Sequence, residues 1–466
     1  MTRTIFALIA LSATASPLAA QPITPAEQQK IDALVAKTLD ETKVPATSIA
    51  IVRDGKIIMA KAYGTASAKL GPATAAMPFQ IASNSKQFIA AALLLLENDG
   101  KLSLDDKVSK WEPEVTRAGD MTIRQLLSHT SGLQDYWPQD YDFVAMETPT
   151  NPQGILNRWG KKPLDYDPGT RWQYSNTGYV VAGRIIEKAS GQPLMTFLTR
   201  RIFTPLGMHP LNIDDSNTPA YPVGNHRFAA GPVRVAKPPA RGWLYSAGEL
   251  SMTAEDLAKW DVARIERKLL PKEDWAEQEA PVILTDGTTT GYGLGVSSGT
   301  ASGRSFVNHG GESTGFLSQN TVYPDSRAAI VVLTNADFGD VTDSLTSGIA
   351  DIVIPKATPV NAHETDRLDD VKAMLEALAA GSPDRSKMTD DLNYYFDATA
   401  IGDYRTSLSA LGTPEKVEMP RPPRLRGGFV NRNYKVSYPG GKSVFIITYA
   451  EPGATGKWEQ FMVSAD

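Results

Sequence analysis

Segments typical of β-strands fall into two groups far apart in the sequence, with a long helix-rich stretch between them. The first group, residues 46–53 and 56–63, is joined by Asp54-Gly55, a strong signal for a hairpin. The second group begins only near residue 291, after a region rich in proline, glycine and aromatic residues that runs from 102 to about 271. Strands bury their apolar faces by joining a sheet, so we predict one antiparallel sheet built from both ends of this region.

The helix patterns complete the expected fold. Helices are predicted around the sheet and in the intervening region, which would form the other wall of a cleft. The fold class is therefore α/β (α+β), an antiparallel sheet flanked by helices with an all-helical insertion. The predicted helices cover residues 27–42, 87–97, 122–127, 179–189 and 254–265, and the predicted later strands cover residues 291–296, 306–309, 315–323 and 328–334.

The pattern changes beyond Ile354. Residues 355–364 contain proline and alanine, which is typical of a linker. After the linker we predict a helix over 366–380 and an antiparallel meander of strands over 429–438, 442–449 and 457–463. The predicted domains are thus residues 21–356 and a small α+β accessory domain at residues 365–466.

The first twenty residues have the pattern of a secretory signal peptide. Arg3 precedes a short apolar run from Ile5 to Leu11, and small residues follow up to Ala19-Ala20. Residues 1–20 are predicted to be removed near Gln21, which leaves a periplasmic or secreted chain without a transmembrane segment. The apolar run is too short to span a bilayer. An uncleaved anchor is the alternative interpretation.

The composition excludes several kinds of chemistry. The chain has no cysteine, so it has no disulfide framework, thiol nucleophile or thiolate metal site. Its five histidines include no pair at the i, i+4 spacing of a helical zinc site, so neither a metal nor another cofactor is expected. A formal charge of −5 does not suit a nucleic-acid partner.

One Ser-x-x-Lys sequence occurs, from Ser83 to Lys86, where a short strand pattern gives way to an apolar helix. Residues three apart share a helix face, so the Lys86 amine can lie beside the Ser83 hydroxyl and help remove its proton. The helix start adds backbone N–H groups and a positive dipole end, which suit the oxyanion of an acyl transfer. The alternative is an ordinary helix start with a solvated lysine, because two common residues at a fixed spacing also arise by chance.

Two further short motifs follow in the chain. Tyr174-Ser175-Asn176 offers a phenol that would relay a proton and an amide that would hold Lys86 and the substrate. His309-Gly310-Gly311 contains residues without side chains, which let a strand approach a ligand closely. Each of these side chains also has a purely structural interpretation. Tyr174 could be a core tyrosine, Asn176 a turn residue and His309 a structural histidine at a strand end.

Taken in this order, the three motifs resemble those of serine hydrolases related to class C β-lactamases, D,D-carboxypeptidases, D-aminopeptidases and family VIII esterases. The stretch from Thr122 to Leu133, Pro168-Gly169-Thr170 before the tyrosine, and Gly315-Phe316 after the glycines are similar to this family too. The resemblance covers roughly residues 25 to 355. It implies a β-lactamase/transpeptidase-like fold.

The resemblance also implies roles for single residues. Ser83 would be the nucleophile, and Lys86 and Tyr174 would handle protons. The substrate-binding residues would be Asn176, His309, Gly311 and Glu312, the last through its backbone N–H as the second oxyanion donor.

His309 is a departure from the β-lactamases, which usually have lysine at this place. A largely neutral imidazole holds a substrate carboxylate less firmly than a permanent cation does. This departure favours the peptidase and esterase branches over efficient β-lactam hydrolysis.

A second serine motif competes with the first. Residues 311–315 match the G-x-S-x-G nucleophile elbow, which requires a strand, a sharp turn and a helix, with an acid and a histidine downstream. Here the following residues have a strand pattern, and the only later histidine is His363 in the predicted linker. Ser83 is therefore preferred to Ser313 as the nucleophile.

The sequence thus predicts a serine hydrolase that cleaves amide or ester bonds through an acyl-enzyme on Ser83. Its partner would be a small-molecule, ester or short peptide substrate. The alternative is a β-lactamase or a penicillin-binding sensor with slow deacylation. Tyr174 and Asn176 favour turnover over sensing, because a mere binder needs no proton shuttle.

Overall fold

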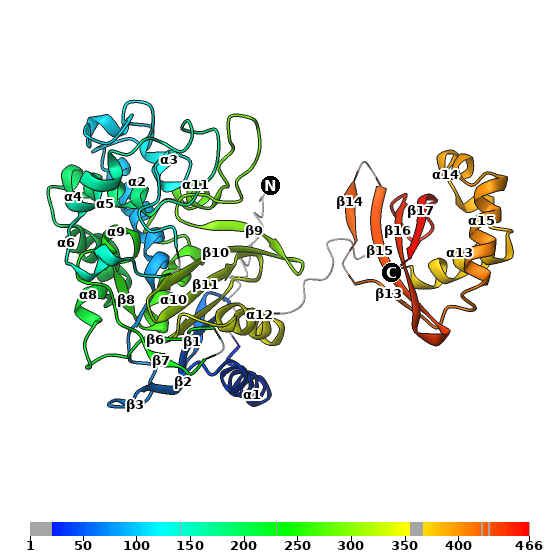
Figure 1. The fold of residues 1–466 in the computed structure, drawn as a ribbon, viewed down its shortest axis with the longest axis horizontal. Coiled ribbons are helices and arrows are strands. Elements are labelled where there is room, and N and C mark those ends of the chain that lie inside the picture. The colour runs from blue at the N-terminus through cyan, green and yellow to red at the C-terminus, as the bar shows by residue number, and fades with distance from the viewer. Residues whose placement is uncertain are drawn as a thin grey trace, which may run out of the picture. The chain divides into compact units, whose positions relative to one another are not determined.

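The computed structural model describes residues 21–139, 141–229, 231–354, 367–420, 423–426 and 429–465. The predicted signal peptide and linker lie outside the described residues. The chain divides between Pro355 and Lys356 into two compact units (Figure 1), and each unit is described by itself. Their assignment as domains with the boundaries given above stays a prediction.

A seven-stranded antiparallel sheet forms the centre of the first unit, in the order β3-β2-β1-β12-β11-β10-β9 (Figure 1). The early hairpin and the late strands meet where β1 pairs with β12, with Ala50 opposite Val331. This pairing confirms the prediction of one sheet built from both ends of the region. The strands are β1 (Ala46–Arg53), β2 (Lys56–Ser67), β3 (Gly71–Pro72), β9 (Ser297–Ala301), β10 (Arg304–Ser313), β11 (Phe316–Tyr323) and β12 (Ala328–Thr334).

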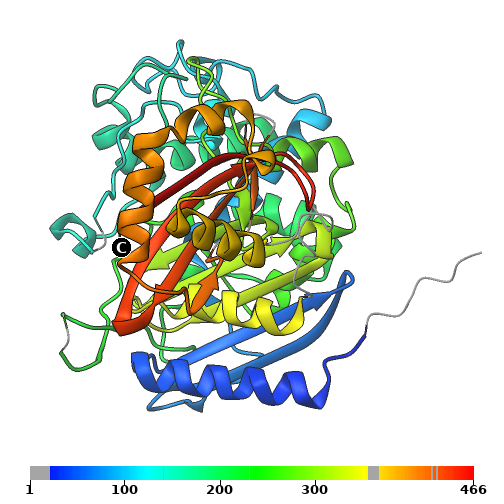
Figure 2. The ribbon, with the colours of Figure 1, turned by 90° about the vertical axis from the view of Figure 1, so that its right-hand side faces the viewer.

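Helices cover both faces of the sheet, because its central strands are apolar on both sides. Alternate residues of β12 divide between two layers, with Ile330 in one apolar cluster and Val331 in the other. On the Ile330 face, α1 and α12 lie side by side (Figure 2). On the Val331 face lie α2 and α10. These four helices are α1 (Pro25–Thr42), α2 (Lys86–Asn98), α10 (Ala254–Ile265) and α12 (Val341–Val353).

α2 is the central buried helix of the first unit. Every residue from Lys86 to Leu96 is buried, which explains a run of alanine and leucine without a polar face. The helix packs against α5 (Asn176–Ser190), whose start carries the Tyr-x-Asn motif. Two of the three motifs therefore lie at the starts of helices that pack together in the core.

The region between the two strand groups contains many helices, but it also contains short strands, so the prediction that the insertion is all-helical is wrong in this detail. One of them, β8, pairs with β4, the two-residue strand that ends three residues before Ser83, and with β5. These pairings hold the approach to the nucleophile turn. The short strands are β4 (Phe79–Gln80), β5 (Leu211–Asn212), β6 (Asn225–His226), β7 (Arg234–Val235) and β8 (Leu250–Met252). The remaining helices are α3 (Ile123–Leu127), α4 (Pro152–Ile155), α6 (Leu194–Leu198), α7 (Thr204–Leu206), α8 (Ile213–Ser216), α9 (Tyr245–Gly248) and α11 (Lys272–Glu279).

The predicted strand over residues 291–296 is wrong. Gly291 and Gly295 have φ values of +68° and +75°, which a regular strand does not allow. The segment is a loop that packs on the start of α2, since a Cβ on Gly295 would lie 2.7 Å from the Lys86 carbonyl oxygen. The regular strand β9 begins only at Ser297.

The second unit has its own sheet and helices, as the C-terminal pattern predicts. Its sheet runs in the order β13-β15-β16-β17, and β14 also pairs with β15. The apolar cluster beneath it includes Leu375, Tyr434, Ile446 and Phe461 and shares no residue with the clusters of the first unit. The elements are α13 (Leu368–Ala380), α14 (Asp390–Tyr395), α15 (Ala398–Ser409), β13 (Lys416–Glu418), β14 (Arg424–Arg426), β15 (Phe429–Tyr438), β16 (Lys442–Ala450) and β17 (Trp458–Ala465).

Candidate active site

Ser83 lies in a 3-10 turn, η1 (Ala82–Ser85), that leads directly into α2. Its three neighbours in the turn are buried, whereas Ser83 is partly exposed and lines a cleft. The Lys86 Nζ is 3.0 Å from the Ser83 Oγ, as the spacing along the helix predicts. The serine is thus accessible from the cleft while its lysine partner is buried.

Lys86 has two further contacts that orient its amine. Its Nζ donates to the Asn176 Oδ1, at 2.9 Å, and to the backbone carbonyl of Ala247. Both of these oxygens only accept hydrogen bonds. A neutral amine has two N–H groups and one lone pair, so the lone pair is left for the Ser83 hydroxyl. Neutral Lys86 is therefore oriented to accept the serine proton.

Burial makes a substantial share of Lys86 neutral near physiological pH. Desolvation lowers the pKa of Lys86 to about 7, although the negative charge of Asp135 opposes the shift. A lysine with a pKa near the working pH is a suitable general base.

Asp135 is a functional residue that the sequence interpretation missed. Its Oδ1 accepts from the Asn176 backbone N–H at 3.1 Å, and its Oδ2 accepts from the Asn176 Nδ2 at 3.2 Å. These bonds turn the Asn176 oxygen toward Lys86. Desolvation raises the pKa of Asp135, opposed by its backbone hydrogen bonds and by Lys86. Asp135 is in a loop 41 residues before Asn176, so no local pattern announces the contact.

Tyr174 lies against both Ser83 and Lys86. Its hydroxyl is hydrogen-bonded to Ser83, and the Lys86 Nζ is 4.9 Å from the centre of its ring. Burial raises the pKa of Tyr174, and the bond to Ser83 opposes that shift. The phenol is therefore a proton donor that stays protonated until a neighbouring base takes its proton.

His129 holds the segment on both sides of Tyr174. Its carbonyl accepts from the Gln173 N–H at 3.0 Å, and its Nδ1 accepts from the Ser175 N–H at 3.1 Å. Its ring centre lies 4.1 Å from that of Tyr174. Burial lowers the pKa of His129 well below its usual value, so the ring is neutral and keeps Nδ1 as an acceptor. His129 belongs to the stretch from Thr122 to Leu133 that is similar to the family, but the sequence interpretation gave this histidine no role.

His309 lines the cleft from β10, but both of its ring nitrogens are occupied within the protein. Its Nδ1 donates to the Gly310 carbonyl, so its Nε2 accepts from the Tyr292 hydroxyl at 2.8 Å. Burial, and then the nearby Lys86, lower the pKa of His309 to about 4. The imidazole is therefore neutral at physiological pH. Tyr292 was not foreseen as its partner, because it lies in the loop predicted as a strand.

Gly311 allows β10 to approach the nucleophile turn. A Cβ at this position would lie 2.1 Å from the Ile81 carbonyl oxygen and 2.3 Å from the Ser318 Oγ. β9 pairs with β10 only from Arg304 to Asn308, so the later residues of β10 line the cleft instead. Among them Glu312 has an exposed side chain, and its backbone follows Gly311 beside η1.

Ser313 is not in a nucleophile elbow. It is buried at the end of β10, its Oγ donates to the Gln80 Oε1 at 2.9 Å, and strand β11 follows instead of a helix. The competing G-x-S-x-G interpretation is therefore wrong for this fold.

The cleft has a volume of about 1310 Å³ and brings the predicted site residues together. Its walls come from the nucleophile turn, from the helical region and from β10 and β11. Ser83, Tyr174, Asn176, His309, Gly311 and Glu312 line it, and Lys86 lies buried behind Ser83. Within the described ranges, no group of three or more histidine, aspartate or glutamate side chains is placed to hold a metal ion. No helix in those ranges is both long and apolar enough for a membrane span.

A serine and a buried lysine at a helix start, with a tyrosine and a glycine-bearing strand edge around them, are the arrangement expected of a serine hydrolase of the beta-lactamase fold. The chain belongs to the beta-lactamase family, whose family model matches residues 31–353.

Known proteins resemble the chain in sequence and in structure. Penicillin-binding protein 4* of Bacillus subtilis is 31% identical over 279 residues, which are 56% of this chain and 61% of that protein. The D-amino acid amidase of Ochrobactrum anthropi, solved with L-phenylalanine amide, has a TM-score of 0.60 and 25% identity over 70% of this chain and 96% of its own. The octameric penicillin-binding protein homologue of Pyrococcus abyssi has a TM-score of 0.62 over 94% of this chain and 99% of its own. At 21% identity, that last match shows the fold alone.

Proposed function

We propose that this protein is a serine hydrolase that cleaves amide or ester bonds through an acyl-enzyme on Ser83. The observation that carries the proposal is the orientation of Lys86. Two acceptors hold its N–H groups, and its lone pair is left for the Ser83 hydroxyl. This arrangement is suited to activating a serine, which is a weak nucleophile without a base.

In the proposed reaction, the Ser83 Oγ attacks the substrate carbonyl carbon and Lys86 takes the serine proton. The backbone N–H groups of Ser83 and Glu312 stabilise the resulting oxyanion, and each such donor is commonly worth about 3 kcal/mol of barrier. Tyr174 passes the proton to the leaving amine or alcohol, whose bond to carbon breaks. Water then attacks the carbonyl carbon of the ester on Ser83 and gives a proton to the same Lys86 and Tyr174 pair. The bond between that carbon and the Ser83 Oγ breaks, the pair returns the proton to the Ser83 Oγ, and the acid is released.

The substrate class follows from the chemistry of the cleft. Its neutral His309 offers no fixed cation for a carboxylate. Four exposed apolar side chains line the cleft: Tyr141, Val144, Phe228 and Val235. We therefore propose amides and esters that lack a free carboxylate and have an apolar acyl or aromatic group, D-amino acid amides among them. The similarity to a D-amino acid amidase supports this choice. Export to the periplasm or out of the cell is part of the proposal and is based on the predicted signal peptide.

Intact mass spectrometry with a fluorophosphonate, a penicillin and p-nitrophenyl butyrate tests the proposal. We expect a stable phosphonate adduct, rapid release of the butyrate and measurable cleavage of D-phenylalanine amide. A long-lived penicillin adduct without hydrolysis of any ester or amide would instead identify a penicillin-binding sensor.

His309→Lys is expected to shift the preference toward substrates with a free carboxylate. A charged hydrogen bond contributes more than a neutral one, so we expect the ratio of kcat/KM for a carboxylate-terminated peptide over a neutral ester to rise roughly tenfold. His309→Gln, which adds no charge, should leave this ratio unchanged. Thermal unfolding is measured first, because the position is buried. An equal change on both substrates would refute the role in substrate choice.

A chain that ends at Ile354 is expected to fold and to keep its reactive serine. The apolar clusters of the two units share no residue, so the first unit can bury its core alone. Labelling of Ser83 by a small phosphonate should stay within about threefold of the full chain. A shortened chain with a normal cooperative unfolding transition but no labelling would show that the second unit helps to build the site.

A further inference from the structure

We infer that a chain of buried hydrogen bonds behind the nucleophile positions Ser83 by holding the turn in front of it. The chain consists of three side-chain amides and one hydroxyl, from Asn320, Gln87, Asn84 and Ser318. We call these four residues the amide chain. They are positioning residues, because they act through the turn and not on the substrate. The inference rests on the proposed function, since it concerns the reactivity of the same serine.

The turn before Ser83 has a strained backbone. Ala82 has a φ of +45°, in the left-handed region that favours glycine. Such a conformation persists only where the surrounding structure enforces it, and it occurs preferentially at active sites. The question is therefore which contacts hold Ala82 in place.

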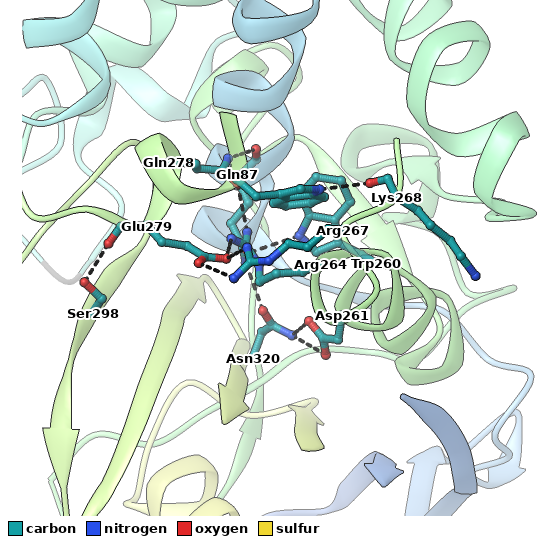
Figure 3. A network of polar contacts seen from close by, with 11 residues as sticks. Gln87, Trp260, Asp261, Arg264, Arg267, Lys268, Gln278, Glu279, Ser298 and Asn320 are labelled. Carbon is teal, nitrogen blue, oxygen red and sulfur yellow. Dashed lines mark hydrogen bonds and ion pairs between the residues drawn. The ribbon is translucent and has the colours of Figure 1, made fainter. Parts of the chain in front are cut away.

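Gln87 sets the direction of the amide chain. Its Oε1 accepts from the Trp260 Nε1 at 3.1 Å and from the Arg264 Nη2 at 3.2 Å (Figure 3). Indole and guanidinium groups only donate hydrogen bonds, so the oxygen of Gln87 has to face them. The Gln87 Nε2 must then point the other way.

The two hydrogens of the Gln87 Nε2 go to two asparagines. One is donated to the Asn320 Oδ1 and the other to the Asn84 Oδ1, both at 3.1 Å. The Asn320 Nδ2 in turn donates to both oxygens of Asp261 at 2.7 Å (Figure 3). Because the two obligate donors fix Gln87, the oxygens of both asparagines must face its Nε2, and each amide has a single orientation.

The other end of the amide chain reaches the nucleophile turn. The Asn84 Nδ2 donates to the Ser318 Oγ at 2.8 Å, so this hydroxyl gives its own proton to the Ile81 carbonyl, at 2.8 Å. The same carbonyl accepts from the Asn84 backbone N–H at 3.1 Å. Ile81 directly precedes the strained Ala82, so these bonds fix the entry to the turn.

Burial makes the amide chain sensitive to the loss of one link. Asn84, Gln87, Asn320 and Ser318 are at most 2% exposed, so water does not replace a missing partner. A broken link leaves the Ile81 carbonyl with the Asn84 backbone N–H as its one partner from the turn and lets Ala82 relax toward negative φ. That movement displaces the Ser83 Oγ and its backbone N–H together and leaves the rest of the cleft in place.

Ser318→Ala tests this inference, with Ser298→Ala as the matched control. The Ser298 Oγ donates to the Glu279 carbonyl at 2.7 Å, at the outer end of the same polar network (Figure 3). We expect Ser318→Ala to slow phosphonate labelling of Ser83, and kcat for p-nitrophenyl butyrate, on the order of tenfold or more, with KM changed less than about twofold. Ser298→Ala should behave as the unaltered chain.

Rescue separates positioning from a general loss of stability. Glycine adopts the left-handed conformation without strain, so Ala82→Gly added to Ser318→Ala should restore most of the labelling rate. Rates are compared at a temperature where thermal unfolding shows every variant to be folded. Ser318→Cys keeps the shape of the side chain and weakens the hydrogen-bond donor, so its labelling rate should lie between those of Ser318→Ala and the unaltered chain. This variant replaces Ser318→Ala in the test if Ser318→Ala does not fold.

The outcomes distinguish the two proposals. Normal labelling of the unaltered chain with an equally reactive Ser318→Ala variant would overturn this inference alone. Loss confined to KM, or no rescue by Ala82→Gly, would also overturn it. An unaltered chain that is neither labelled nor active would overturn the proposed function and this inference together.

Discussion

Ser83→Ala is expected to abolish both covalent labelling by a fluorophosphonate and hydrolysis of every ester and amide. No other serine has the buried Lys86 amine at 3.0 Å among the contacts of the described residues. Without the Ser83 Oγ, no acyl-enzyme forms, and the loss should equal the full contribution of covalent catalysis. Intact mass spectrometry before and after the probe, together with p-nitrophenyl butyrate turnover, measures the effect.

Ser313→Ala is the matched control for this experiment. Ser313 is buried and donates to Gln80, so its removal affects packing and not the reacting atoms. We expect most of the labelling and activity to remain. If Ser313→Ala removed activity and Ser83→Ala did not, the assignment of the nucleophile would be wrong.

Lys86→Met and Tyr174→Phe are each expected to lower turnover by a factor on the order of 10² to 10⁴, the usual contribution of a general base or acid. Lys86→Met removes the lone pair that faces Ser83 and leaves a side chain that fits a buried position. Tyr174→Phe keeps the ring that packs on His129 and removes only the hydroxyl. Single-turnover labelling and steady-state kcat are compared for both variants. Near-normal turnover in either variant would exclude the corresponding role.

The pH profile gives an independent test of Lys86. Its pKa is lowered to about 7, and only the neutral amine accepts the serine proton. The rate of Ser83 labelling should therefore rise with pH, by about tenfold per unit below pH 7, and level off above it. His309 does not cause this rise in rate, because its pKa of about 4 lies well below the pH range over which the rate rises. A rate that is flat between pH 5 and 8 would contradict Lys86 as the base.

Local patterns in the sequence were sufficient for the elements that carry the site. The Ser83 and Lys86 spacing predicted one helix face, and the structure places their side chains 3.0 Å apart. The Asp54-Gly55 hairpin and the strands β11 and β12 were also recognisable, because a strand or a hairpin depends mainly on residues close in sequence. In the main sheet, the strand predicted over residues 291–296 is a loop with two glycines at positive φ, and the short strands β3 and β9 were not predicted.

The partners of the site residues were not predictable in the same way. Asp135 orients Asn176 from a loop 41 residues earlier in the chain, and Tyr292, in another loop, donates a hydrogen bond to the His309 Nε2. His129 was visible in the sequence, but only the fold places its ring against Tyr174. Such contacts join residues whose separation carries no periodic signal.

The sequence by itself determined the reactive types and their order: a serine and lysine at a helix start, then a tyrosine and asparagine, then glycines on a strand. The tertiary structure decided their state. Burial lowers the pKa of Lys86, two acceptors direct its lone pair, and the amide chain of Asn84 and Gln87 ends on the Ile81 carbonyl. Desolvation and hydrogen-bond direction depend on every group packed around a residue, and packing exists only once distant segments have come together.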